Sequence, residues 1–370
     1  MTSLSTQDLN DLLQGACILG AGGGGPISMG QAGLTYIGTR SVPLIGLDEA
    51  ANDGLVLVCA GAGAPEAEKH FPVATLFRTI DLAEELLLAA HGKRFSYVLP
   101  IETGAGSTLL AAAAAVYKNV PLIDADPAGR AVPELTMLTL ASLPPSPVVL
   151  ADDKGAQLSF SVPTTAAAEP PMRAAISSAP FTEFAGLSLW PLPVSTMRPV
   201  LIPNTVSFTR DLGRSLREAR AAGRDPIETV VSALGGRVLA RDATLTAQTD
   251  STSGGFDLGQ LTITCTDGSQ ILIYNKNENF LAWSSAASAP LITAPGLISY
   301  LTMDGAPFSN ADTPPIGTRI AVIASPARPQ LLPLLPAFVS TLQSIGYGGA
   351  PVLMPSPFST PVGAPGDPSR

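Results

Sequence analysis

The feature that most constrains the fold is an alternation of strand-like and helix-like segments over the first 150 residues. GLVLVCA at residues 54–60 and FSYVLPI at residues 95–101 are continuous apolar runs, as expected of buried strands. Helical periodicity follows each run, over residues 73–91 and 107–117. Because such alternation is typical of α/β layers, we predict a layered α/β/α sheet whose ligands bind in the loops that follow its strands.

The second half of the chain has a different composition. Residues 143–203 are rich in Pro, Ser and Ala, which indicates turns and a domain junction. Helical segments are predicted within residues 204–234, and residues 237–325 alternate β-branched residues with turn signals. We therefore expect an α/β domain over residues 1–165. A helix-led domain of mainly antiparallel β structure, sandwich-like or barrel-like and ending in a flexible tail, is expected over residues 166–370.

Composition narrows the choice of partners. A net charge of -9 without a cluster of Lys or Arg argues against nucleic acid. No apolar stretch has membrane length and the N-terminus has no signal pattern, so we expect a cytoplasmic protein without membrane contact.

With 2 His and 3 separated Cys, we expect neither a His/Cys metal cluster nor a structural disulfide. The apolar surplus is compatible with a homo-oligomer.

Residues 5–17 have helical periodicity, and a glycine-rich segment, LGAGGGGP at residues 19–26, follows this predicted first helix. Its spacing satisfies GxGxxG, but that fingerprint requires a preceding strand, so we do not expect a dinucleotide site. Consecutive glycines can present backbone N–H groups to an anion, because no side chain keeps the ligand away. Gly22, Gly23, Gly24 and Gly25 are therefore candidate substrate-binding residues. The alternative is a turn packed closely against a neighbouring segment.

A carboxylate and a second glycine turn lie between a predicted strand and a predicted helix, in ETGAGS at residues 102–107. This order places an acid beside the free N–H donors of a helix N-terminus. We predict that Glu102 is catalytic and that Gly104 and Gly106 bind substrate. The alternative is that Glu102 only caps the helix.

A third segment, DADPAGRAVPE at residues 124–134, brings three acids and one arginine into a loop after a strand. Crowded carboxylates cannot all ionise cheaply, so their pKa values separate, as a general acid and base pair requires. We predict that Asp124, Asp126 and Glu134 are catalytic and that Arg130 binds a substrate carboxylate or orders the acids. A divalent metal on Asp124 and Asp126 is compatible with this pattern. The structural alternative is that Arg130 pairs with Asp126 or Glu134.

A fourth segment, YNKNENF at residues 274–280, follows the alternating strand QILIY. Asn is depleted in strands, so we expect a loop here. Asn275, Asn277, Glu278 and Asn279 would offer donors and acceptors to a polar cyclic ligand. The alternative is an Asn-rich loop that bonds its own backbone.

Taken together, these segments resemble the S-methyl-thiohydantoin desulfurase-like family, whose members are often encoded beside hydantoinase and oxoprolinase genes. The likeness covers most of the chain and rests on LGAGGGGP, ETGAG, DADPAGRAVPE, GGRVLARDATLT with SGGFDLGQLTI, and NKNENFLAW with APGLISYL. It implies an α/β N-terminal domain, a β-rich C-terminal domain and activity towards a thiohydantoin or a similar five-membered ring. The chain departs from the family pattern at Ala128 and Val132, where Met and Phe are usual, and at Gly296, where an acid is usual.

The expected activity is hydrolytic desulfuration. Water activated by Asp124, Asp126 or Glu134 would attack the ring carbon that bears sulfur, and hydrosulfide would leave. Glycine-loop N–H groups and the amides of Asn277 and Asn279 would stabilise the developing charge. The site is expected between the domains.

Two other functions fit the same residues. One is ring opening of a hydantoin or lactam, and the other is a non-catalytic accessory subunit of a hydantoinase or oxoprolinase. A catalytic role predicts that the acids of residues 124–134 converge on one cleft with residues 275–279, whereas an accessory role predicts scattered acids and an exposed apolar face.

Overall fold

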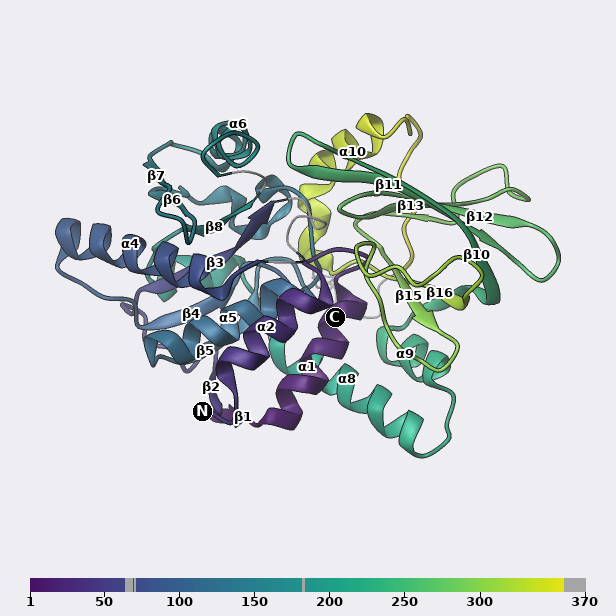
Figure 1. The fold of residues 1–370 in the computed structure, drawn as a ribbon, viewed down its shortest axis with the longest axis horizontal. Coiled ribbons are helices and arrows are strands. Elements are labelled where there is room, and N and C mark those ends of the chain that lie inside the picture. The colour runs from purple at the N-terminus through teal and green to yellow at the C-terminus, as the bar shows by residue number, and fades with distance from the viewer. Residues whose placement is uncertain (64–68, 70, 182–183, 356–370) are drawn as a thin grey trace, which may run out of the picture.

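The computed structural model describes residues 1–63, 69, 71–181 and 184–355. Two β-sheets organise the chain, one on the left and one on the right of Figure 1. The expected flexible tail falls largely on residues 356–370, which lie outside the described residues.

The first sheet is mixed. In sheet order its strands are β1 (Thr2–Leu4), β2 (Val42–Gly46), β5 (Leu122–Asp126), β4 (Tyr97–Pro100), β3 (Val56–Gly63), β8 (Phe184–Leu189), β6 (Val148–Ala151) and β7 (Gln157–Phe160), and β9 (Ile202–Pro203) pairs with β5. The four strands β2, β5, β4 and β3 run parallel. β8, β6 and β7 continue the sheet as antiparallel neighbours beyond β3. The parallel strands therefore all deliver their carboxyl ends to one edge, where ligands of α/β sheets bind.

Helices cover both faces of this sheet. One face carries α1 (Thr6–Leu19), α2 (Ile27–Ile37), α4 (Val73–His91) and α5 (Ala105–Lys118). The other carries the 3-10 helices η1 (Leu135–Met137), η2 (Thr139–Ser142), η3 (Arg198–Val200) and η4 (Pro329–Leu334) together with α6 (Thr165–Ile176), α7 (Val194–Met197) and α10 (Leu335–Ser344). The predicted α/β/α layering is thus confirmed.

Local sequence explains where the helices of this layer begin. Ser5 and Asp8 form the reciprocal capping box of α1, with the Ser5 side chain accepting from Asp8 N–H and Asp8 accepting from Ser5 N–H. The alanine-rich helix α5 is almost completely buried, because its small side chains allow close packing against the sheet and neighbouring helices. Both helices were predicted from their periodicity.

The second sheet is antiparallel throughout and curls into a half-barrel. Its order is β14 (Ile292–Thr293), β13 (Glu278–Ser284), β12 (Gln270–Lys276), β11 (Phe256–Thr264), β10 (Arg237–Ser253), β16 (Arg319–Ser325) and β15 (Leu297–Thr302). The register of β10 shifts against both neighbours. Such bulges bend a strand and increase its twist, which accounts for the curl. The predicted β-rich C-terminal domain is confirmed.

Segments from the second half of the sequence also pack on the first sheet. The region over residues 143–203, where we expected the junction, contributes β6, β7 and β8 to that sheet. Helix α10 follows the second sheet in sequence and buries Phe338 and Leu342 in the core of the first. The chain therefore passes from the first sheet to the second and back.

The helices α8 (Thr205–Ala221) and α9 (Pro226–Leu234) confirm the two helical segments predicted there. Helix α8 crosses α1 at two glycines. A Cβ on Gly213 would lie 1.8 Å from the carbonyl oxygen of Asp11, and a Cβ on Gly15 would lie 1.9 Å from that of Thr209. Beside this crossing, Arg217 donates to both carboxylate oxygens of Asp11, at 2.7 and 2.9 Å. The two halves of the chain are joined here by backbone contact and a bidentate ion pair.

In the described ranges, no helix combines the length and the apolar composition that crossing a bilayer requires.

We predict that Gly213→Ala destabilises the protein, because its methyl group forces α8 away from α1. The expected loss in the free energy of unfolding is about 1–3 kcal/mol, as for other overpacked contacts. Denaturant unfolding measures this change. Gly348→Ala is the control, because no described atom lies within 4 Å of its Cβ position, and equal stability of the two variants would contradict the prediction.

Candidate active site

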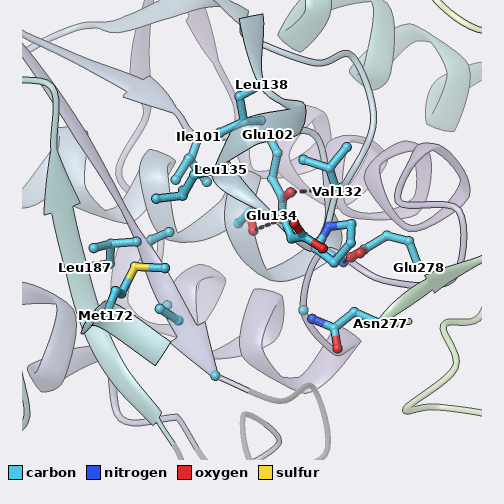
Figure 2. Close-up of a pocket in the computed structure, with 18 of the residues that line it drawn as sticks. Ile101, Glu102, Val132, Glu134, Leu135, Leu138, Met172, Leu187, Asn277 and Glu278 are labelled. Atoms are coloured by element: carbon cyan, nitrogen blue, oxygen red, sulfur yellow. Dashed lines mark hydrogen bonds between the residues drawn. The ribbon is translucent and has the colours of Figure 1, made fainter. Parts of the chain in front are cut away.

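A cavity of about 70 Å³ lies at the carboxyl ends of β3 and β4. It is lined by Gly24, Gly25, Ala60–Gly63, Ile101, Glu102, Ser107, Val132–Leu135, Leu138, Met172, Arg173, Leu187, Asn277 and Glu278. Figure 2 shows that the lining has two sides, with Met172 and Leu187 on one and Glu102, Glu134, Asn277 and Glu278 on the other. The cavity therefore offers an apolar wall facing a polar one, as small-molecule sites commonly do.

Glu102 follows β4 and is held by two donors. Ser107 Oγ donates to its Oε1 at 2.8 Å and Val132 N–H donates to its Oε2 at 2.8 Å. Burial raises the pKa of Glu102 to about 7, and these two hydrogen bonds oppose that rise. Near neutral pH this carboxyl can therefore either accept or release a proton.

Glu278 enters the cavity from β13 and is only 2% exposed. Its Oε1 accepts the Gly24 N–H at 3.1 Å, and its Oε2 has no hydrogen-bond partner among the described residues. Burial raises the pKa of Glu278 well above its ordinary value, and the negative charge of Glu102 raises it further. Glu278 therefore keeps its proton to a higher pH than an exposed glutamate does.

Arg130 is the buried cation of this cluster, at 1% exposure. Its Nε donates to the Ala131 carbonyl, and its Nη1 donates to the carbonyls of Pro295 and Gly296 at 2.8 and 3.0 Å. Nη2 finds no hydrogen-bond partner in the described part of the chain. Burial lowers the pKa of Arg130 to about 10, so the guanidinium stays charged at neutral pH near Glu102 and Glu278.

Glu134 reaches the cavity from the loop after β5. Its Oε1 accepts from Lys276 Nζ at 2.5 Å and from Thr341 Oγ1 at 3.0 Å. The Lys276 ammonium and the Arg173 guanidinium both lie over the ring of Phe256, at 4.2 and 4.1 Å from its centroid. These contacts connect α6, α10 and the second sheet beside the cavity.

The other two predicted catalytic acids hold the backbone. Asp124 Oδ1 accepts the Ser207 N–H at 2.9 Å, in the first turn of α8. Asp126 accepts the Ala128 and Gly129 N–H groups with one oxygen and the Thr103 hydroxyl with the other. Burial raises the pKa of Asp126, and these hydrogen bonds oppose the rise.

The pair Asp124 and Asp126 is not arranged as a shared metal site, because both oxygens of Asp126 are occupied by protein donors. Within the described ranges, no group of three or more His, Cys, Asp or Glu residues is suited to hold a metal ion.

The predicted loop at residues 274–280 is wrong, because β12 and β13 form a tight hairpin here with Asn277 at its turn. Asn277 adopts a φ of 57°, a conformation that Asn tolerates better than most residues. Its Oδ1 accepts from Asp257 N–H, and it lines the cavity. Asn279 lies deeper, where it donates to the Ile298 carbonyl and accepts from Tyr300 and Asn310. Asn275 lines a separate small pocket.

The predicted glycines lie where two backbone segments touch. A Cβ on Gly104 would lie 2.4 Å from Gly24 Cα, and one on Gly106 would lie 3.1 Å from Gly25 Cα. Gly24 also accepts from the N–H groups of Gly106 and Ser107 at the start of α5. Gly22 packs against the side chain of Asn279. The first turn of α5 is thus bonded to the glycine loop.

Sequence reasoning missed part of the lining. Ala60–Gly63 end β3, and the small residues that follow its apolar run were the available signal. Met172 and Arg173 lie on α6, within the segment interpreted as a junction, and Leu187 lies on β8 of the same segment. Their proximity depends on β8 pairing with β3, which no local pattern indicated.

Comparisons with known proteins agree with this architecture. The model of the S-Me-THD-like N-terminal domain matches residues 7–162, and that of the S-Me-THD-like C-terminal domain matches residues 164–333. The chain is similar to the crystal structure of a protein from Chromobacterium violaceum, a structural-genomics target, with 30% sequence identity and a TM-score of 0.83. The likeness covers 95% of this chain and 100% of that one. No curated protein matches the chain.

We predict that Glu278 makes stability depend on pH. The unfolded chain loses this proton near the ordinary pKa of 4.5 whereas the folded protein keeps it, so the free energy of unfolding falls as pH rises above 4.5. Glu278→Gln has no proton to lose and should show a smaller fall. Thermal unfolding at about pH 5 and about pH 8 measures the difference.

The control for this experiment is Glu85→Gln, which replaces an exposed glutamate on α4. The melting temperature of this variant should change between the two pH values as much as that of the wild type. A Glu278→Gln protein whose melting temperature falls as much as that of the wild type would contradict the prediction.

Proposed function

This chain belongs to the S-Me-THD-like family, and on that premise we propose that it is a hydrolytic desulfurase for a thiohydantoin-type five-membered ring. The observation that carries the proposal is Glu102, a cavity carboxyl whose pKa of about 7 suits a general base at neutral pH. The two-sided lining of the cavity supports the same reaction class.

The apolar wall of the cavity suits a flat ring. Ile101, Met172 and Leu187 offer contacts to a ring face, where desolvation favours binding. The polar wall offers Glu102, Glu278 and the Asn277 amide to the N–H and carbonyl groups at the ring edge. A ring held between the two walls exposes its sulfur-bearing carbon to Glu102.

In the proposed reaction, the Glu102 carboxylate takes a proton from water as the water oxygen bonds to the sulfur-bearing carbon. The tetrahedral intermediate then forms the C=O bond and breaks the C–S bond. Sulfur leaves as hydrosulfide, or as a thiol when it carries an alkyl group, and the ring becomes a hydantoin. Charge that develops during the attack lies near Arg130, which is cationic at neutral pH.

We predict that Glu102→Gln lowers kcat by about 10²-fold or more, because the amide cannot accept the proton of water. The assay measures sulfide or thiol release and the loss of ring absorbance with thiohydantoins, and includes hydantoins to detect ring opening. Asp124→Asn is the matched control. Its Oδ1 can still accept from Ser207 N–H, so the α8 contact and the activity should be kept.

Loss of activity in Asp124→Asn together with full activity in Glu102→Gln would refute the assignment of the base. Ring opening without sulfur release would identify a cyclic amidohydrolase instead. No turnover of any ring by the wild type would refute the enzyme proposal.

We also predict the pH dependence of the reaction. A base must be ionised, so kcat/KM should rise with pH around the Glu102 pKa of about 7. A glutamate base with the ordinary pKa would make kcat/KM rise around pH 4.5 instead. Initial rates at saturating and limiting substrate over this range measure the midpoint, and a midpoint near the ordinary value would contradict the role of Glu102.

A further inference from the structure

We infer that Glu278 is the proton donor to the departing sulfur, on the same polar wall of the cavity as the base Glu102. This inference rests on the proposed function and assigns a second catalytic residue to the same cavity. Glu278 comes from the second sheet and Glu102 from the first, so the two carboxyls approach the cavity from different halves of the chain.

The hydrogen bonds distinguish the two carboxyls. Glu102 accepts one donor on each oxygen, from Ser107 and Val132, which favours its charged form. Glu278 accepts the Gly24 N–H on Oε1, and Oε2 is buried without a hydrogen-bond partner among the described residues. A bare oxygen in a buried site is where a proton stabilises the group most. The geometry therefore places the proton on Glu278 Oε2.

The charge balance points the same way. Arg130 supplies one positive charge near Glu102 and Glu278, and it can compensate one carboxylate but not two. Glu134 and Arg173 also line the cavity, but each already bonds a partner of opposite charge, Lys276 and Glu169 respectively. With Glu102 ionised and Glu278 protonated, the buried group formed by Glu102, Glu278 and Arg130 is neutral.

With these roles, every proton in the reaction has a donor and an acceptor when the sulfur of the ring carries an alkyl group. Water bonds to the ring carbon and gives one proton to Glu102. The C–S bond breaks, and sulfur leaves with the electron pair and takes the Glu278 proton, so a neutral thiol departs. Two protons then remain, the O–H proton of the former water and the proton on Glu102. One of them restores Glu278, and the other protonates the ring nitrogen.

The test compares leaving groups of similar size and different basicity, an S-ethyl and an S-trifluoroethyl thiohydantoin. Trifluoroethanethiolate is the weaker base and leaves without needing a proton, whereas ethanethiolate needs one. Glu278→Gln should therefore lower the thiol release rate by about 10²-fold or more for the S-ethyl ring and by less than about tenfold for the S-trifluoroethyl ring. Glu102→Gln should lower both rates by a similar factor.

Equal losses for both rings in Glu278→Gln would overturn the donor role and leave the proposed hydrolysis standing. No thiol release from either ring by the wild type would overturn the proposed function and the donor role together. A purely structural role of Glu278 predicts the equal loss, because poor folding does not discriminate between leaving groups.

A second measurement uses only the wild type, so it does not depend on the folding of a variant. As the pH rises far enough to remove the proton from Glu278, kcat for the S-ethyl ring should fall while kcat for the S-trifluoroethyl ring stays level. The same alkaline profile for both rings would overturn the inference. The ionisation of Glu102 affects kcat for both rings alike. A difference between the two pH profiles of kcat therefore reports on the proton donor alone.

Discussion

The hydrogen bond from Gly24 N–H to Glu278 holds the second half of the chain against the glycine loop of the first. This contact leaves no space for side chains, since a Cβ on Gly23 would lie 2.0 Å from Glu278 Oε1. On its other side the loop touches Gly104, and its carbonyl at Gly24 accepts from the first turn of α5. One short segment thus positions a carboxyl from the second sheet, the start of α5 and, through Ser107, the Glu102 carboxyl.

The acids of this protein differ in how many donors surround them. Asp126 accepts three hydrogen bonds and Asp124 accepts the Ser207 N–H in the first turn of α8, and both hold backbone segments in place. Glu102 accepts two and faces the cavity, and Glu278 accepts the Gly24 N–H on one oxygen and has a bare second oxygen. Chemistry that moves protons needs carboxyls that the protein has not fully satisfied. Glu102 and Glu278 also line the cavity, whereas the two aspartates bond backbone groups outside its lining, so the glutamates are the acids suited to the proposed reaction.

Much of the fold could be predicted from the sequence, because local patterns determine it. The capping box at Ser5, the periodicity of α4 and the alanine run of α5 each depend on neighbouring residues in sequence. The sequence predicted several residues of the site but not what each of them does. Glu102, Glu134 and Glu278 do line one cavity, whereas Asp124 accepts a hydrogen bond from α8. Which way a carboxylate points, and which strand pairs with β3, depend on contacts between distant segments that one sequence does not reveal.

The path of the chain has a consequence for how the cavity opens. The backbone leaves the first sheet to build the second and then returns, so that α10 buries Phe338 in the core of the first sheet. The two sheets are therefore connected by two covalent crossings as well as by the α1–α8 contact, and a body held at several points cannot swing freely about a single hinge. In the enzyme that we propose, substrate exchange therefore falls to side chains and short loops at the rim of the cavity.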